Sequence, residues 1–120
     1  MDFRDLNRAT PKDEYPMPKV GTLINAAAGH KIMNFMNGNA GYNQNFMALE
    51  DVHKTAFRIP SVVCIFEYLV MMFGLMNAGA MYQCNMNSIL HDLIVILVEI
   101  YIDHVVVKLK STTSHLDDLF

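Results

Sequence analysis

The sequence predicts an α+β fold with an antiparallel hairpin near the C-terminus, and three observations predict it. Two segments, 18–28 and 77–94, carry apolar residues at helical spacing. Segments rich in β-branched and aromatic residues lie between and after them. With 120 residues, 52% of them hydrophobic, the chain can form one domain with a core of its own.

The first forty residues are expected to be extended, then helical, then a strand. Prolines within residues 10–18 keep the chain extended, because proline removes a donor and biases its neighbour away from helix. Pro18 can open an amphipathic helix, and Gly29 is a good C-terminal stop. Residues 31–36 then predict a strand. The Asn37-Gly38 step after it fits a hairpin, or a tight turn that brings backbone amides to a ligand.

The second half of the chain is expected to alternate strands and helices. Segments 55–59 and 64–71 predict a strand pair, and Asn77 is a residue type favoured at a helix N-cap. The helix that follows keeps its spacing to about Ile94. Strands at 95–102 and 105–109 come next, with Asp103-His104 between them. A capping-box pattern at 114–117 opens another helix.

Composition and charge narrow the class of protein. The net charge is -3, so tight binding to nucleic acid by this chain alone is not expected. Cys64 and Cys84 lack CxxC spacing and are expected to be buried thiols rather than a disulfide or a zinc site. The first eight residues carry no signal peptide pattern, and the longest apolar run, 93–98, is too short to span a bilayer. A soluble intracellular protein without a membrane partner is expected.

The apolar run near the C-terminus is interrupted at Tyr101-Ile102-Asp103-His104. A carboxylate at the tip of a hydrophobic hairpin suits a metal site, since an unpaired buried charge is costly. Taken alone, Asp103-His104 is more typical of a solvated turn, Asn37-Gly38 of an ordinary turn, and Tyr42 of a core aromatic residue. A zinc site at Asp103 and His104 would need further converging ligands.

Five separated segments favour a functional site at these residues over ordinary turns, because all five occur in one order over nearly the whole chain. They are DFRDLN at 2–7, FMNGNAGYNQ at 35–44, KTAFR at 54–58, FGLMNAGAMYQ at 73–83 and YIDH at 101–104. Together they resemble the reverse transcriptase of gypsy-type long-terminal-repeat retrotransposons. The resemblance implies a palm, an antiparallel sheet with packed helices, plus partial fingers. Residues 1–120 would form a partial reverse transcriptase domain without thumb and RNase H, starting inside a strand as a truncated reading frame.

The resemblance also implies a site with three carboxylates and two Mg²⁺ ions. Those carboxylates fall on Asn37, Asp103 and His104, so only Asp103 is intact, and Gly38 stands at a further ligand position of the family. Mg²⁺ prefers charged oxygen ligands, whereas a histidine nitrogen suits Zn²⁺ or Cu²⁺ better. Binding of Mg²⁺ is therefore expected to be impaired, with a rate loss on the order of a thousandfold or more.

Further family positions concern the incoming nucleotide. The turn formed by Gly38, Asn39, Ala40 and Gly41 would contact the metal and triphosphate, and Tyr42 would lie under the sugar. Phe73, Gly74 and Gln83 would pack against the nucleotide and template, and Arg4 would belong to a strand joining fingers and palm. The sequence departs from the family pattern at Met72, where proline is usual, and at Val95-Ile96, where a polar or glycine-containing turn is usual.

The function implied by the resemblance is RNA-directed DNA synthesis from deoxynucleoside triphosphates on a primer-template. This copy is expected to be catalytically inactive, with weak or no nucleic-acid binding as a fragment. Two alternatives stay open: a non-catalytic module that binds nucleic acid or a partner protein, and a relic without function.

Overall fold

The computed structural model describes residues 2–109, and its chain divides into two compact units. The sheet unit consists of Glu14–Asn39 and Gly79–Phe120, and the hairpin unit consists of Met1–Asp13 and Ala40–Ala78. Within the described residues, no helix is long and apolar enough to cross a membrane.

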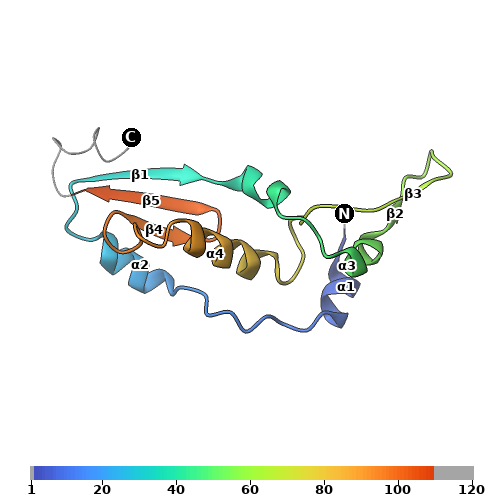
Figure 1. The fold of residues 1–120 in the computed structure, drawn as a ribbon, viewed down its shortest axis with the longest axis horizontal. Helices are drawn as coiled ribbons and strands as arrows, with labels where there is room; N and C mark the ends of the chain where they lie inside the picture. Colours follow the sequence, from blue (N-terminus) through green and yellow to red (C-terminus); the bar gives the residue numbers. More distant parts are fainter. Residues whose placement is uncertain (1, 110–120) are drawn as a thin grey trace. The chain divides into compact units, whose positions relative to one another are not determined.

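The sheet unit contains a three-stranded antiparallel sheet (Figure 1), in which β5 lies between β1 and β4. Its strands are β1 Ile32–Asn37, β4 Val98–Tyr101 and β5 His104–Leu109. Its helices are α2 Val20–Ala27 and α4 Ala78–Ile89, which begins at the boundary of the unit. The expected helix at 77–94 ends at Ile89, because the chain then makes successive turns up to β4.

The core lies on one face of this sheet. Alternate residues of a strand point to opposite faces, and on this face β4 and β5 contribute only aliphatic side chains. Helix α4 and the turns after it supply the partly buried residues that cover them. The core residues are Val98, Ile100, Val105 and Val107, packed against Met86, Leu90, Ile94 and Leu97.

The opposite face holds a buried ion pair that sequence reasoning did not find. The Lys108 ammonium donates to a carboxylate oxygen of Glu99 at 2.5 Å, and both side chains are buried. The same ammonium donates to the backbone carbonyl of Ala26 at 3.1 Å, in the last turn of α2. A cation is favourable at a helix C-terminus, so Lys108 joins α2 to the sheet.

The hairpin unit is built from short elements. They are α1 Arg4–Ala9, η1 Asn39–Gln44, α3 Leu49–Val52, η2 His53–Thr55, β2 Phe57–Arg58 and β3 Ile65–Phe66, with η1 starting at the unit boundary. The expected strand pair is present but each strand has only two residues. The aromatic rings of Phe57 and Tyr68 stack with their centroids 5.2 Å apart.

Four expectations for individual residues were wrong. Arg4 lies in α1 and not in a strand, because the Asp2 carboxylate accepts from the Arg4 backbone N–H at the helix start. Cys64 is exposed because the chain between β2 and β3 is uncovered, and Cys84 is exposed because it lies one residue beyond the sheet-facing Gln83. His104 is not in the turn but is the first residue of β5. The helix expected at 114–117 lies outside the described residues.

Candidate functional site

The three predicted metal positions come together at one end of the three-stranded sheet. Asn37 is the last residue of β1 and His104 is the first residue of β5, and the two are register partners. Asp103 lies in the turn between β4 and β5, directly before His104. Directly opposed residues of an antiparallel pair share a face, so Asn37 and His104 lie on the same face of the sheet.

Asp103 is held by its backbone and its carboxylate is partly buried. The backbone N–H of Gly38 donates to the Asp103 carbonyl at 2.6 Å, which ties the end of β1 to the turn. The Asp103 side chain is 19% exposed, and its carboxylate lies 3.6 Å from Nε2 of His104, whose side chain is 61% exposed. The carboxylate therefore has an imidazole as neighbour, at the position where the sequence resemblance implies a second carboxylate.

Tyr82 on α4 contacts Gly38 at the edge of the site, and the sequence analysis did not identify this role. The Tyr82 hydroxyl donates to the Gly38 carbonyl at 2.7 Å. Burial, and then the charge of Asp103, raise the pKa of the Tyr82 phenol. A Cβ at position 38 would collide with the Tyr82 hydroxyl, so this position favours glycine. In the sequence Tyr82 only continues the apolar stripe of a helix, and no signal there indicates the hydrogen bond.

Gln83, the next residue of α4, contacts the other side of the site. Its side-chain oxygen accepts from the Ile102 backbone N–H at 2.6 Å, and its side-chain nitrogen donates to the Ile100 carbonyl at 3.2 Å. Ile102 has φ of 55°, a left-handed conformation that is unusual for a β-branched residue. Adjacent residues of one helix thus hold the two backbone segments that carry Asn37 and Asp103.

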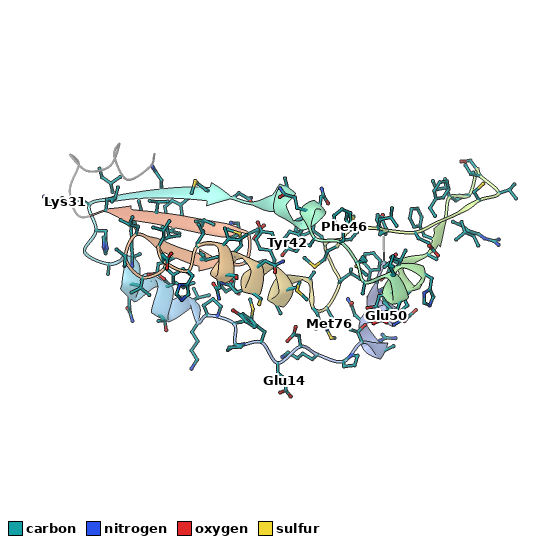
Figure 2. The ribbon with its side chains drawn as sticks, in the orientation of Figure 1. Glu14, Lys31, Tyr42, Phe46, Glu50 and Met76 are labelled. Carbon is teal, nitrogen blue, oxygen red and sulfur yellow. The ribbon has the colours of Figure 1, made fainter. Side chains whose placement is uncertain are left out.

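The nucleotide-binding positions divide between the two units. Gly38 and Asn39 belong to the sheet unit, whereas Ala40, Gly41 and Tyr42 belong to the hairpin unit as part of η1 (Figure 2 labels Tyr42). The Gly41 carbonyl accepts from the side-chain nitrogen of Asn45 at 2.9 Å.

The hairpin unit brings two of its predicted residues together. The Tyr42 and Phe73 rings pack with their centroids 4.2 Å apart; Tyr42 is buried and Phe73 is exposed. Gly74 has φ of 90°, a conformation that favours glycine, and its carbonyl accepts from the Asn7 side chain at 2.7 Å. Gly74 is thereby tied to α1, and the hydrogen bond joins a residue of the DFRDLN segment to the Phe73-Gly74 motif.

The donor set does not fit a pair of Mg²⁺ ions. Asp103 is its single carboxylate, Asn37 offers a neutral amide oxygen, and His104 offers a nitrogen. Between residues 2 and 109, no three side chains of His, Cys, Asp or Glu converge in a way that could hold a metal ion.

The sequence is similar to retrotransposon polyproteins. It is 34% identical over 119 residues to the Retrovirus-related Pol polyprotein from transposon 297 of Drosophila melanogaster, covering 99% of this chain and 11% of that protein. It is 29% identical over 115 residues to the corresponding polyprotein from transposon gypsy, covering 96% and 11%. It is 32% identical over 115 residues to the Transposon Tf2-7 polyprotein of Schizosaccharomyces pombe, covering 96% and 8%. The chain thus spans about a tenth of the length of these relatives.

Solved structures confirm the predicted fold. The foamy viral protease-reverse transcriptase in complex with RNA/DNA hybrid aligns with a TM-score of 0.83 and 15% identity, over 98% of this chain and 16% of that one. The native Prototype Foamy Virus Protease-Reverse Transcriptase aligns with a TM-score of 0.81 and 18% identity, over 98% and 15%. The family model described as "Reverse transcriptase (RNA-dependent DNA polymerase)" matches residues 1–119, and the chain belongs to that family.

Proposed function

We propose that this chain is a palm segment, with part of the fingers, of a retrotransposon reverse transcriptase, and that as it stands it does not polymerise DNA. Family membership supports the first half of the proposal. The observation that supports the second half is the placement of Asn37 and His104. These two residues are register partners, and the sequence resemblance implies carboxylates at both positions, next to the single remaining carboxylate, Asp103.

The charge of the site is the physical reason. Nucleotidyl transfer needs charge neutralisation around the phosphates, which Mg²⁺ supplies in this family when it is bound. A site with one carboxylate attracts divalent cations far less than a site with three, and an imidazole is a poor ligand for a hard ion. The chain's own residues still fix the Asp103 backbone and the Gly38 turn, so the scaffold of the site is retained while its charge is reduced.

The partner proposed for this chain is a nucleic acid, and the binding is weak. Related folds are known in complexes with RNA/DNA hybrid and with double-stranded DNA, and these partners are those of the foamy virus proteins. This chain has a net charge of -3, so it lacks the excess of basic residues that neutralises phosphates.

A primer-extension assay tests the proposal. The unaltered chain and the variant with Asn37→Asp and His104→Asp are incubated with primer-template, deoxynucleoside triphosphates, and Mg²⁺ or Mn²⁺. We expect no extension by the unaltered chain and measurable extension by the double variant. The matched control adds Asp103→Asn to the double variant, which should abolish the regained extension. Extension by the unaltered chain would refute the proposed inactivity, and a double variant without activity would show that the absence of these two carboxylates is not its sole cause.

Binding without catalysis is measured separately. A filter-binding titration of the unaltered chain against primer-template at several salt concentrations should give a weak response that falls further as salt rises. A tight, saturable response would favour the alternative of a non-catalytic binding module. A thermal melt followed by circular dichroism tests the remaining alternative, since a cooperative transition argues against a relic that does not fold.

A further inference from the structure

We infer that Gln83 is a positioning residue, which acts through the turn that carries Asp103 and not by contact with nucleotide or template. The inference rests on the proposed function in one respect: it takes Asp103 as the remaining anionic ligand of the site. It differs from the expectation raised by the family resemblance, in which Gln83 packs against the nucleotide and template.

The burial of Gln83 is the first argument. Its residue is 1% exposed, the most completely buried large side chain among those described, and its amide bonds only to groups of the sheet unit. A buried amide that loses its partners costs the full desolvation of each group. The Gln83 amide therefore binds only groups inside the sheet unit. In this conformation its side chain has almost no exposed surface with which to contact a bound molecule.

The Gln83 side chain makes two hydrogen bonds to the backbone that leads to Asp103, one to Ile100 and one to Ile102. Its side-chain nitrogen donates to the carbonyl of Ile100 in β4, and its side-chain oxygen accepts from the N–H of Ile102 in the turn. A carbonyl requires a donor and an N–H requires an acceptor, so these partners fix which end of the amide faces the turn. The same amide cannot rotate by half a turn without losing both bonds.

Hydrogen bonds that run from Gln83 through Asn87 to Tyr15 support that orientation of the amide. The Gln83 nitrogen also donates to the Asn87 side-chain oxygen at 3.0 Å, one helical turn further along α4. The Asn87 nitrogen in turn donates to the Tyr15 hydroxyl at 2.7 Å. Each member is oriented by the next, which makes the network more rigid than a single hydrogen bond.

The conformation of Ile102 explains why such a clamp is needed. A left-handed backbone is unfavourable for a β-branched residue, so Ile102 adopts φ of 55° only when its surroundings hold it there. Gln83 supplies a 2.6 Å bond to the N–H of this very residue. The Ile102 side chain packs beside Gly79, where a Cβ would lie at ordinary van der Waals distance, 3.4 Å, from the Ile102 Cδ1 atom. Without the clamp, the turn is expected to relax and to move the Asp103 carboxylate away from Asn37.

Amide hydrogen exchange, followed by NMR on the full chain, tests the inference without any need for activity. The variant is Gln83→Met, which keeps the length and removes both bonds. The matched control is Gln44→Met, the same exchange of residue types at an exposed position of η1. We expect the Ile102 amide to exchange roughly tenfold faster in Gln83→Met, as the loss of one net hydrogen bond implies. The amides of Val105 and Val107 in β5 should stay within about twofold of the parent, and Gln44→Met should change none of them.

Each outcome of the exchange experiment is decisive. An unchanged Ile102 amide would overturn the inference, and so would an equal acceleration of all sheet amides, which would mean that Gln83 only contributes to general stability. If Gln83→Met does not fold, Asn87→Leu removes only the outer partner of the clamp. Asn87→Leu should raise the exchange rate of the Ile102 amide about twofold and leave the exchange rates of the other sheet amides unchanged. The absence of this local effect would also overturn the inference.

A second measurement separates this inference from the proposed function. Manganese binding is followed by electron paramagnetic resonance in the chain with Asn37→Asp and His104→Asp. We expect Gln83→Met to weaken Mn²⁺ binding about tenfold in that background. Adding Ile102→Gly should restore part of it, because glycine adopts the turn conformation without a clamp. No Mn²⁺ binding by the repaired site would count against the proposed function, whereas hydrogen exchange would still decide the role of Gln83.

Discussion

Tyr82 couples the electrostatics of the site to the stability of the fold. Burial, and then the Asp103 charge, raise the pKa of its phenol, so the folded chain keeps this proton when the unfolded chain has lost it. The folded form then binds more protons, and the free energy of unfolding falls as the pH rises above about 10. We expect Tyr82→Phe to flatten this decline, measured by urea unfolding between about pH 8 and pH 11. An equally steep decline in the variant would assign it to other groups.

Gly38 and Tyr82 form a pair that can be tested by a double-mutant cycle. Gly38→Ala places a Cβ against the Tyr82 hydroxyl and should lower the free energy of unfolding by about 2 kcal/mol. Tyr82→Phe removes the hydroxyl and should reduce that cost by about 1 kcal/mol when the two changes are combined. Additive effects in urea unfolding would show that the two residues do not interact in solution.

At the level of elements, the connection between α4 and β4 is a poor local match of sequence to structure. Val95 has φ of 73°, although a β-branched side chain disfavours the left-handed region. The sequence analysis identified Val95-Ile96 as the place where a polar or glycine-containing turn is usual, and the positive φ of Val95 shows why glycine suits it. We expect Val95→Gly to raise the free energy of unfolding by about 1 kcal/mol. Ile96→Gly is the control: both residues are 71% exposed, but Ile96 does not have a positive φ, so its replacement should be destabilising.

The ion pair between β4 and β5 makes a second element-scale prediction. Lys108→Met leaves the Glu99 carboxylate buried without its partner and leaves the Ala26 carbonyl without its donor. The expected loss is about 3 kcal/mol in the free energy of unfolding. Adding Glu99→Leu removes the stranded charge and should recover more than half of that loss. A double variant less stable than Lys108→Met would contradict this explanation.

For the molecule as a whole, hydrophobic periodicity and local motifs in the sequence predicted much of the fold. The long-range polar contacts could not be predicted from the sequence. The amphipathic stripe of α2, the hairpin of β4 and β5, and the α+β class follow from residue spacing. The convergence of Asn37, Asp103 and His104 could be inferred only from the family resemblance, because it depends on the pairing of strands far apart in the chain. The roles of Gln83 and Lys108 depend on hydrogen bonds between elements, for which a single sequence carries no periodic signal.

The surface of the hairpin unit leads to a prediction about the solubility of the whole molecule. Its apolar residues from the end of β2 through β3 are exposed; they are Ile59, Val62, Val63, Ile65 and Phe66. An exposed apolar patch beside short strands promotes association, and the small net charge of -3 opposes it only weakly.

Val63 is the residue of this patch best suited to a test, because it is fully exposed. We expect Val63→Lys to raise the concentration at which light scattering detects association, while the free energy of unfolding changes by less than about 0.5 kcal/mol. The control is Leu49→Lys on α3, also an exposed site, which reduces the net negative charge by the same amount outside the patch. If both variants shift the scattering onset equally, net charge and not the patch controls association. A larger shift for Val63→Lys locates the association surface on the segment between β2 and β3.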